Sequence, residues 1–352
     1  MKHKLLAALL VAAVFAVTVV VRVQRFLNVP PETPGREVTI FIEPGQSFEQ
    51  TARMLREAGL ITDEFKFRLL ASYTGLGSKI RAGEFLLSTG FIPAKILDIL
   101  ANTPGVLHRL SVPEGLTLRQ TAKLVEEAGL GGAAAFETAA ADGPLLAKYD
   151  IPAKTAEGFL FPQTYLLTRK PGSDLRYVVE AMLAEFRKQA KSIWPDGAPV
   201  GKALLETVTL ASIVEKESAL PAERPKVAGV FVNRLAKGML LQTDPTVIYG
   251  LGEAYAGSLH RSQLDDPGNL YNTYKRPGLP PGPICSPGRE SLLAASNPEK
   301  HGLYYFVAKK DGSHYFSATL DEHNEAVRRY QLGKQGRANA QERKRDNEPQ
   351  AD

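Results

Sequence analysis

The sequence predicts an α+β protein with three parts: an N-terminal transmembrane helix, a small α+β module and a larger mixed α+β domain. Three observations lead to this prediction. An uncharged apolar run covers residues 5–21, a strand-turn-helix pattern occurs twice at an offset of 70 residues, and short motifs rich in proline and glycine become dense after residue 155. A chain of 352 residues is long enough for an anchor and two domains.

The apolar run near the N-terminus has basic residues on both sides. Lys2 and Lys4 precede it, and Arg22 and Arg25 follow it. Its length is near the lower limit for a membrane span, and Val23 together with arginine side chains that reach toward the interface can extend it. We therefore predict a membrane anchor whose apolar part contacts lipid.

A cleaved signal peptide is the alternative, because residues 14–16 form an acceptable small-residue cleavage site. The apolar run continues past that site without a break, which favours the anchor. Charge does not fix the orientation, since both flanks are basic, and we expect the large C-terminal part to be exported. The predicted segments are a cytoplasmic N-terminus at 1–4, a transmembrane helix at 5–23 and a stiff Pro-rich linker at 24–37.

Two segments of the chain resemble each other, residues 45–60 and residues 115–130. A glycine, a Gln-Thr-Ala triplet and a Glu-Ala-Gly-Leu quartet coincide in the two copies. Each copy follows a β-rich stretch, at 38–42 and at 107–112, and a turn with proline and glycine. The pattern predicts a strand, a turn and an amphipathic helix in each copy.

The expected helix ends in both copies carry suitable residues. Ser47 and Thr117 are natural N-caps, because a hydroxyl can accept a hydrogen bond from a free amide of the first turn. Gly59 and Gly129 stand where a helix commonly ends in a left-handed residue. The two copies are therefore expected to fold alike.

The first copy continues into a small module that we assign to residues 38–105. A second helix is predicted at 63–72, a strand at 83–87 and a further helix at 93–100. This β-α-α-β order resembles a LysM-type glycan-binding module. A small α+β spacer that binds nothing is the alternative.

The larger domain is assigned to residues 106–332 and contains the second strand-helix copy at 107–130. The expected helices and strands of its remainder follow the patterns of apolar residues. Helices are predicted at 174–190, 201–216 and 224–237, a loop-rich region at 240–287, and strands at 303–308 and 314–317.

The C-terminal part of this domain has clear local signals. Asp311 and Gly312 between the two predicted strands indicate a hairpin. Thr319 and Glu322 have the spacing of a capping box that opens a last helix reaching about Tyr330. Residues 333–352 are polar and charged and are predicted to form a disordered tail.

Composition excludes several classes of function. The one cysteine, Cys285, cannot form an intramolecular disulfide and is interpreted as an inert small residue. The six histidines show no HxxxH or HExxH spacing, so we predict no metal site and no cofactor. A net charge of +5 suits an anionic lipid or cell-wall surface and is too small to indicate nucleic acid.

Two carboxylates stand at the end of a strongly apolar helical stretch. Residues 204–214 are apolar on nearly every face, and Glu215 and Glu217 follow them. At ~100° per residue the two side chains point about 200° apart, so one is expected to be structural and the other to face a pocket. Periodicity does not say which, and two exposed surface charges are the alternative.

A carboxyl group against apolar walls resists ionisation and can donate a proton near neutral pH. Breaking a glycosidic bond needs such a donor, because the leaving oxygen must be protonated. The loop-rich region adds amides, hydroxyls and tyrosines at 241–250, 271–274 and 278–284, which suit sugar rings and acetamido groups. Ordinary turn chemistry is the alternative for these loops.

Four strings of residues together resemble the endolytic murein transglycosylases of the YceG/MltG-like family. They are residues 211–218, 241–250, 271–274 and 278–282, and the resemblance extends over nearly the whole chain. Gln163 departs from it, since the family usually has an acid after Phe-Pro. In the family's Glu-Lys-Glu motif the second acid is the catalytic one, which falls on Glu217.

The resemblance implies a single-pass inner-membrane protein whose bulk lies in the periplasm or outside the cell and cleaves within nascent peptidoglycan strands. It implies that Glu217 protonates the bridging oxygen and then, as carboxylate, takes a proton from the muramyl C6 hydroxyl, giving a 1,6-anhydro end. The candidate substrate-binding residues are Gln242, Thr243, Asp244, Tyr249 and Asn272. The expected partners are glycan strands, membrane lipid and peptidoglycan synthases, with no nucleic acid.

Two other functions compete with this one. A hydrolytic muramidase-like enzyme would use Glu217 as acid and Asp244 as partner. A non-catalytic wall-binding scaffold would use only the LysM-like module.

Overall fold

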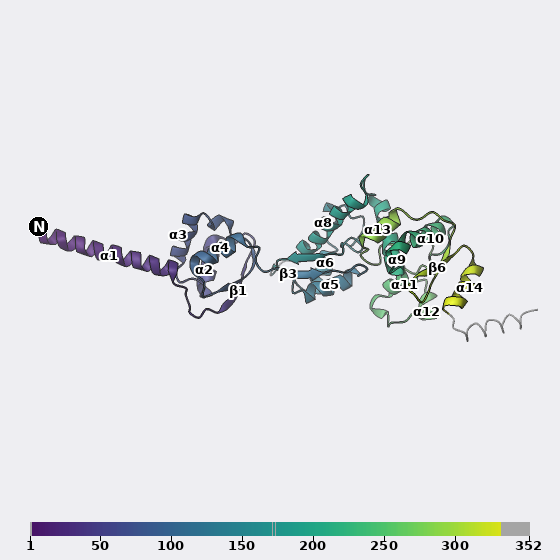
Figure 1. The fold of residues 1–352 in the computed structure, drawn as a ribbon, viewed down its shortest axis with the longest axis horizontal. Coiled ribbons are helices and arrows are strands. Elements are labelled where there is room, and N and C mark those ends of the chain that lie inside the picture. The colour runs from purple at the N-terminus through teal and green to yellow at the C-terminus, as the bar shows by residue number, and fades with distance from the viewer. Residues whose placement is uncertain (1, 171, 173, 332–352) are drawn as a thin grey trace, which may run out of the picture. The chain divides into compact units, whose positions relative to one another are not determined.

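The computed structural model describes residues 2–170, 172 and 174–331 (Figure 1). The tail predicted at 333–352 lies outside these residues. The chain divides into two compact units. The first contains Met1–Leu110, Glu127–Gly131 and Tyr165–Ser173, and the second contains Ser111–Glu126, Gly132–Thr164 and Asp174–Asp352.

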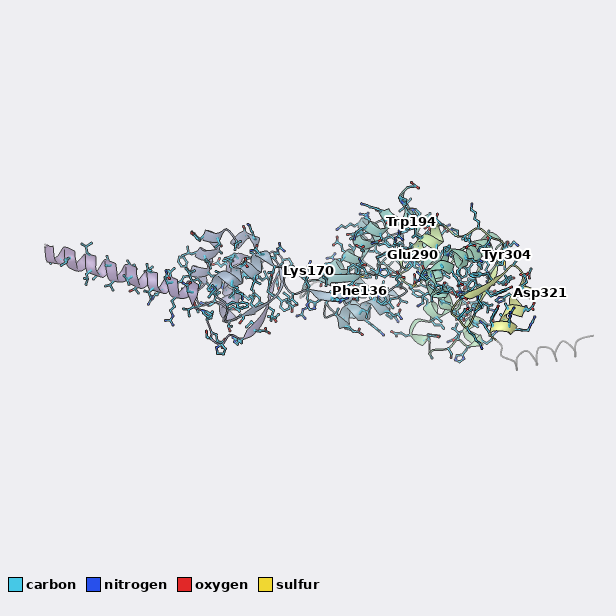
Figure 2. All side chains as sticks on the ribbon, viewed as in Figure 1. Phe136, Lys170, Trp194, Glu290, Tyr304 and Asp321 are labelled. Atoms are coloured by element: carbon cyan, nitrogen blue, oxygen red, sulfur yellow. The ribbon has the colours of Figure 1, made fainter. Side chains whose placement is uncertain are left out.

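The first unit begins with the long helix α1 (Lys2–Asn28). Its segment Leu9–Asn28 has a mean hydropathy of 1.9 and is long and apolar enough to cross a membrane. Figure 2 shows that the described side chains of α1 project away from the rest of the unit along most of the helix. The helix is therefore compatible with the predicted anchor by length and composition.

The predicted linker at 24–37 is held against the first unit and does not stand free. Phe26, near the end of α1, is only 5% exposed and belongs to the core of the unit. Thr89 holds the rest of the predicted linker by two hydrogen bonds. Its hydroxyl donates to Glu32 Oε2 at 2.7 Å and accepts from the Arg36 amide at 2.9 Å. Burial of a large aromatic side chain explains why the helix continues to Asn28 in place of the expected spacer.

The first unit has the predicted β-α-α-β order. Strands β1 (Glu37–Ile42) and β2 (Gly83–Ser88) pair antiparallel with Ile40 opposite Phe85. Between them lie α2 (Phe48–Glu57), α3 (Glu64–Thr74) and the 3-10 turn η1 (Gly77–Lys79), and α4 (Pro93–Asn102) follows β2. The core of the unit consists of residues from both strands and all these helices. The LysM-like assignment stays a prediction.

The second copy of the repeat folds like the first. Strand β3 (His108–Ser111), which pairs with β4 (Thr164–Leu167), leads into α5 (Leu118–Glu127). The Thr117 hydroxyl accepts from the Gln120 amide at 3.1 Å, as Ser47 accepts from Gln50 at 3.2 Å. Gly59 and Gly129 have φ of +74° and +69°, so the left-handed helix ends predicted for them are confirmed.

The second unit is mainly helical, with one β-hairpin. The hairpin and the capping box at Thr319 and Glu322 are confirmed. The elements before the loop-rich region are α6 (Ala133–Ala139), α7 (Gly143–Lys148), α8 (Arg176–Ile193), α9 (Gly201–Glu217), η2 (Pro221–Glu223) and α10 (Arg224–Ala236). Those after it are α13 (Arg289–Ser296), β5 (Tyr305–Ala308), β6 (His314–Ser317) and α14 (Leu320–Tyr330).

The region predicted as loop-rich at 240–287 needs correction in its first part. It contains α11 (Asp244–Leu251), the 3-10 turn η3 (Gly252–Ala254) and the short α12 (Arg261–Leu264). Pro245 sits in the first turn of α11, where its fixed φ favours a helix start and its missing N–H costs nothing. A proline that suggests a loop from sequence thus marks a helix N-terminus here.

Candidate active site

Helix α9 carries the two predicted carboxylates through the interior of the second unit. Its residues from Val208 to Val214 are all buried, and α10 and α13 pack against it. Glu217 is the last helical residue, and the backbone leaves helical geometry at Ser218 with φ −126° and ψ 114°. The two acids are therefore fixed by a buried helix and not by a surface loop.

Glu215 is a structural residue. Its side chain is 6% exposed, and its Oε1 lies 3.0 Å from a guanidinium nitrogen of Arg224. Its Oε2 accepts a hydrogen bond from the Gly288 amide at 3.0 Å. Arg224 also lies 3.6 Å from Glu114, so Glu215 belongs to an ion-pair cluster that joins α9 to α10 and to two loops.

Glu217 points to the other side of the helix and lines a cleft of about 480 Å³. The walls come from α10, α14, both hairpin strands and the segment before α11. The lining residues are Glu217, Phe231, Arg234, Leu241, Gln242, Thr243, Asp244, Tyr274, Tyr305, Phe306, Val307, Ala308, His314, Leu320, His323, Val327 and Gln331. The prediction that one acid is structural and the other faces a pocket is confirmed.

The surroundings of Glu217 favour its protonated form. Burial is the main cause that raises the pKa of its carboxyl, and the nearby negative charge of Asp244 raises it further. A hydrogen bond from the Thr243 hydroxyl and the positive charges of His314 and Arg234 act in the opposite direction. Since the net pKa shift is upward, Glu217 can hold a proton to higher pH than an ordinary glutamate.

Thr243 is held in place by two buried threonines. Its amide donates to Thr273 Oγ1 at 3.1 Å, and its carbonyl accepts from Thr246 Oγ1 at 2.7 Å. Thr246 and Thr273 hydroxyls are 2.8 Å apart. The hydroxyl of Thr243 is therefore aimed at Glu217 by a rigid support.

The residues on either side of Thr243 are exposed to the cleft. Gln242 has a φ of +53°, a left-handed conformation that is uncommon outside glycine and often marks a functional site. Asp244 accepts a hydrogen bond from Tyr274 Oη at 2.6 Å. The structure thus brings Gln242, Thr243 and Asp244 together with Glu217, as the sequence predicted.

Tyr249 and Asn272 lie away from this cleft. Asn272 is fully buried, and its amide donates to the carbonyls of Leu264 and Asp266 at 3.1 and 2.7 Å, so it shapes the 264–272 loop. Tyr249 faces a second cavity of about 940 Å³, where its hydroxyl donates to Glu157 Oε2 at 3.0 Å. A role of these two residues in holding sugar stays a prediction.

Glu157 is a further buried acid, with 7% exposure. Besides Tyr249, the Leu118 amide donates to it at 3.0 Å, so it also satisfies the N-terminus of α5. Burial raises its pKa from 4.5 to about 7, although these two donors act against the shift. No role was predicted for Glu157 from the sequence.

Several charged or titratable residues of the cleft were not predicted from the sequence, among them Arg234 and His314. Arg234 is buried and donates to the carbonyls of Tyr304 and Leu241 at 2.7 and 2.8 Å. His314 lies 2.7 Å from Glu223 Oε2 through Nδ1. Neither residue belongs to the four sequence strings on which the family resemblance was based. The only signal in the sequence was that Arg234 stands among apolar residues on a predicted helix.

The expectation of an inert Cys285 agrees with its surroundings. The thiol is buried, lies 3.4 Å from the Ser212 carbonyl, and burial raises its pKa. Within the described residues no group of three or more metal-binding side chains occurs.

A carboxyl group with a raised pKa in the wall of a polar cleft is typical of proteins that act by general acid–base chemistry. Fold and site together define the class of this protein: an α+β protein of two units with such an acid at the end of a buried helix. The chain belongs to the YceG-like family, whose model matches residues 40–329. The resemblance noted in the sequence is thereby confirmed.

Named relatives support this membership. The chain is 32% identical over 309 residues to the endolytic murein transglycosylase of Bacillus subtilis, covering 83% of this chain and 84% of that protein. It is 30% identical to the endolytic murein transglycosylase of Streptococcus pneumoniae, covering 82% of this chain and 58% of that longer protein. A crystal structure of a YceG-like protein from Listeria monocytogenes has 31% identity and a TM-score of 0.54, covering 82% of this chain and 98% of that one.

Proposed function

We propose that this protein is a lytic transglycosylase that cuts peptidoglycan within its glycan strands. The observation that carries the proposal is the position of Glu217: it ends a buried helix, lines the cleft and has a raised pKa. The names of the relatives from Bacillus subtilis and Streptococcus pneumoniae supply the substrate class. Cleavage within nascent strands would end their elongation.

In the proposed mechanism Glu217 is the one acid–base residue. Its proton passes to the oxygen between N-acetylmuramic acid and N-acetylglucosamine as that glycosidic bond breaks. The C6 hydroxyl of the muramyl residue attacks its own anomeric carbon and gives up its proton to the Glu217 carboxylate. The product ends in a 1,6-anhydro ring, Glu217 is protonated again and no water is consumed.

The neighbours of Glu217 suit these steps. The exposed carboxylate of Asp244 lies where it can stabilise the positive charge that develops on the sugar ring. Tyr274 fixes Asp244, and Thr243 donates to Glu217. Gln242 offers an amide to the substrate, because its side chain is exposed and its backbone is held by a hydrogen bond to Thr273.

The first test is Glu217→Gln. We expect glycan cleavage to fall by about a hundredfold to ten-thousandfold, because the proton donor is lost while the shape is kept. Purified glycan strands are digested and the ends are identified by mass spectrometry. Cleavage at the wild-type rate by this variant would rule out the role of Glu217, and retained strand binding without cleavage would support it.

A hydrolytic muramidase is the second candidate, because Asp244 lines the same cleft as Glu217. Asp244→Asn separates the two functions. Transglycosylation needs one carboxyl, so we expect activity to fall by less than about a hundredfold and the ends to stay anhydro-muramyl. Reducing ends in the wild-type digest would instead establish hydrolysis.

We extend the proposal to location and partners. Helix α1 would anchor the protein in the cytoplasmic membrane, and the chain that follows α1 would lie outside the cytoplasm, where glycan strands and peptidoglycan synthases are found. The β-α-α-β part of the first unit would bind glycan in the manner of a LysM module. Full-length protein and a variant lacking only residues 2–23, compared by fractionation of cells, test the anchor.

A further inference from the structure

The exposed face of α3 is unusually apolar. Phe65, Leu69 and Tyr73 recur every four residues and are 63%, 55% and 92% exposed. Side chains at this spacing lie on one face of a helix. Single exposed apolar residues are ordinary, but three in one row form a patch that commonly marks a binding surface.

A hollow beside this row has a mixed lining, in which Arg68, Ser72 and Ser78 accompany apolar side chains. It has a volume of about 650 Å³ and is lined by Phe65 and Leu69 of α3 and by Phe48 of α2. Phe48 in turn stacks on the buried Phe67 with ring centres 5.7 Å apart. The patch therefore rests on the rigid core of the first unit.

The end of α1 lies next to α3. Phe26 of α1 packs in the core of this unit, and Lys66 of α3 places its ammonium group 5.7 Å from the centre of the Phe26 ring. Tyr73 is seven residues further along α3, which is about 10 Å at the helical rise. Figure 1 shows α3 at the edge of the first unit from which α1 leaves, with β1 on the opposite side.

The charged groups near the row are paired with one another. The carboxylates at the start of α3 are both paired, Asp63 with Lys66 at 3.0 Å and Glu64 with Arg56 at 2.9 Å. Arg68 beside the row is paired with Glu49 at 3.4 Å. Tyrosine is itself enriched where a protein meets the membrane interface.

From this geometry we infer that Phe65, Leu69 and Tyr73 insert into the lipid surface from which α1 emerges. The inference rests on the proposal that α1 spans the membrane. The first unit is then held to the bilayer at two places, by the span and by the face of α3. Its apolar row is covered by lipid and not by water.

The test uses Tyr73→Trp in the full chain, reconstituted in vesicles of phosphatidylcholine with a quarter phosphatidylglycerol. Brominated acyl chains on the phosphatidylcholine quench tryptophan emission on contact. The emission of the unsubstituted chain, whose one tryptophan is Trp194, is subtracted. We expect a blue-shifted emission that brominated lipid quenches several-fold more than at Leu86→Trp, a position that is 49% exposed on β2.

A third variant, Val19→Trp in α1, separates the two proposals. Quenching at position 19 without quenching at position 73 overturns the inference and leaves the anchor intact. No quenching at either position overturns the anchor itself. A blue shift at position 73 without quenching also overturns the inference, because it shows that protein covers the row.

Discussion

The two sides of α9 differ in what surrounds a glutamate. On one side the Glu215 side chain contacts Arg224 and the Gly288 amide, which hold it in place. On the other side Glu217 meets a cleft, a threonine hydroxyl and the negative charge of Asp244. Two glutamates that are two residues apart therefore differ in role: Glu215 is structural and Glu217 is proposed to be reactive, because their neighbours differ.

Glu215→Gln should have the largest effect on stability. It leaves the buried Arg224 with the half-exposed Glu114 at 3.6 Å and the Ser218 carbonyl at 3.3 Å, and breaking one partner of a buried ion pair costs about 3–5 kcal/mol. We expect the lower end of that range because Glu114 compensates in part. Urea unfolding measures the loss.

Glu217→Gln is the matched control for that measurement. It removes a carboxyl whose burial favours the neutral form, so the free energy of unfolding should stay the same or rise at neutral pH. If Glu217→Gln destabilised the fold as much as Glu215→Gln, the contrast between the two sides of α9 would be wrong.

Glu157 extends the comparison to an acid outside the cleft. Its pKa rises from 4.5 to about 7 in the folded protein, so between these pH values the native state keeps a proton that the unfolded chain releases. Stability therefore falls as pH rises through this window, by about 3 kcal/mol in all, and above it this group causes no further change with pH. Glu157→Gln should flatten the curve of unfolding free energy against pH between about 4.5 and 7, measured relative to wild type.

Thr243→Val should have the smallest effect. It removes the hydrogen bond that lowers the pKa of Glu217, so that pKa should rise further. Cleavage by a protonated acid would then persist to higher pH, while the rate at its optimum changes by less than about tenfold. A pH–rate profile checks this, and a shift of the basic limb to lower pH would contradict it.

The sequence predicted local structure well where it depends on contacts between residues close together in the chain. Two helices begin after the expected N-caps, Ser47 and Thr117, and end at the expected left-handed glycines, Gly59 and Gly129. Such caps and glycines depend on only a few neighbouring residues. It also predicted that Glu215 and Glu217 diverge, since this follows from helix geometry alone. Helix α11 was missed because Pro245 has the same local signal in a loop and in a first helical turn.

The remainder of the site depends on contacts between distant segments. Arg234 is held in the wall of the cleft by hydrogen bonds to the carbonyl oxygens of Leu241 and Tyr304. His314 lies on the hairpin, about a hundred residues after Glu217 in the chain. Tyr249 shares a motif with Thr243 but lies at the other end of α11, so it faces a different cavity. No spacing in the sequence distinguishes these outcomes.

The buried Phe26 has a mechanical consequence for a protein anchored by α1. Because this ring is buried in the core of the first unit, α1 cannot rotate freely against the rest of the unit. Any change in the tilt of α1, such as a thinner or thicker bilayer imposes, would be passed directly to the unit as a rotation. Bilayer thickness would thus set the angle at which the first unit stands above its membrane.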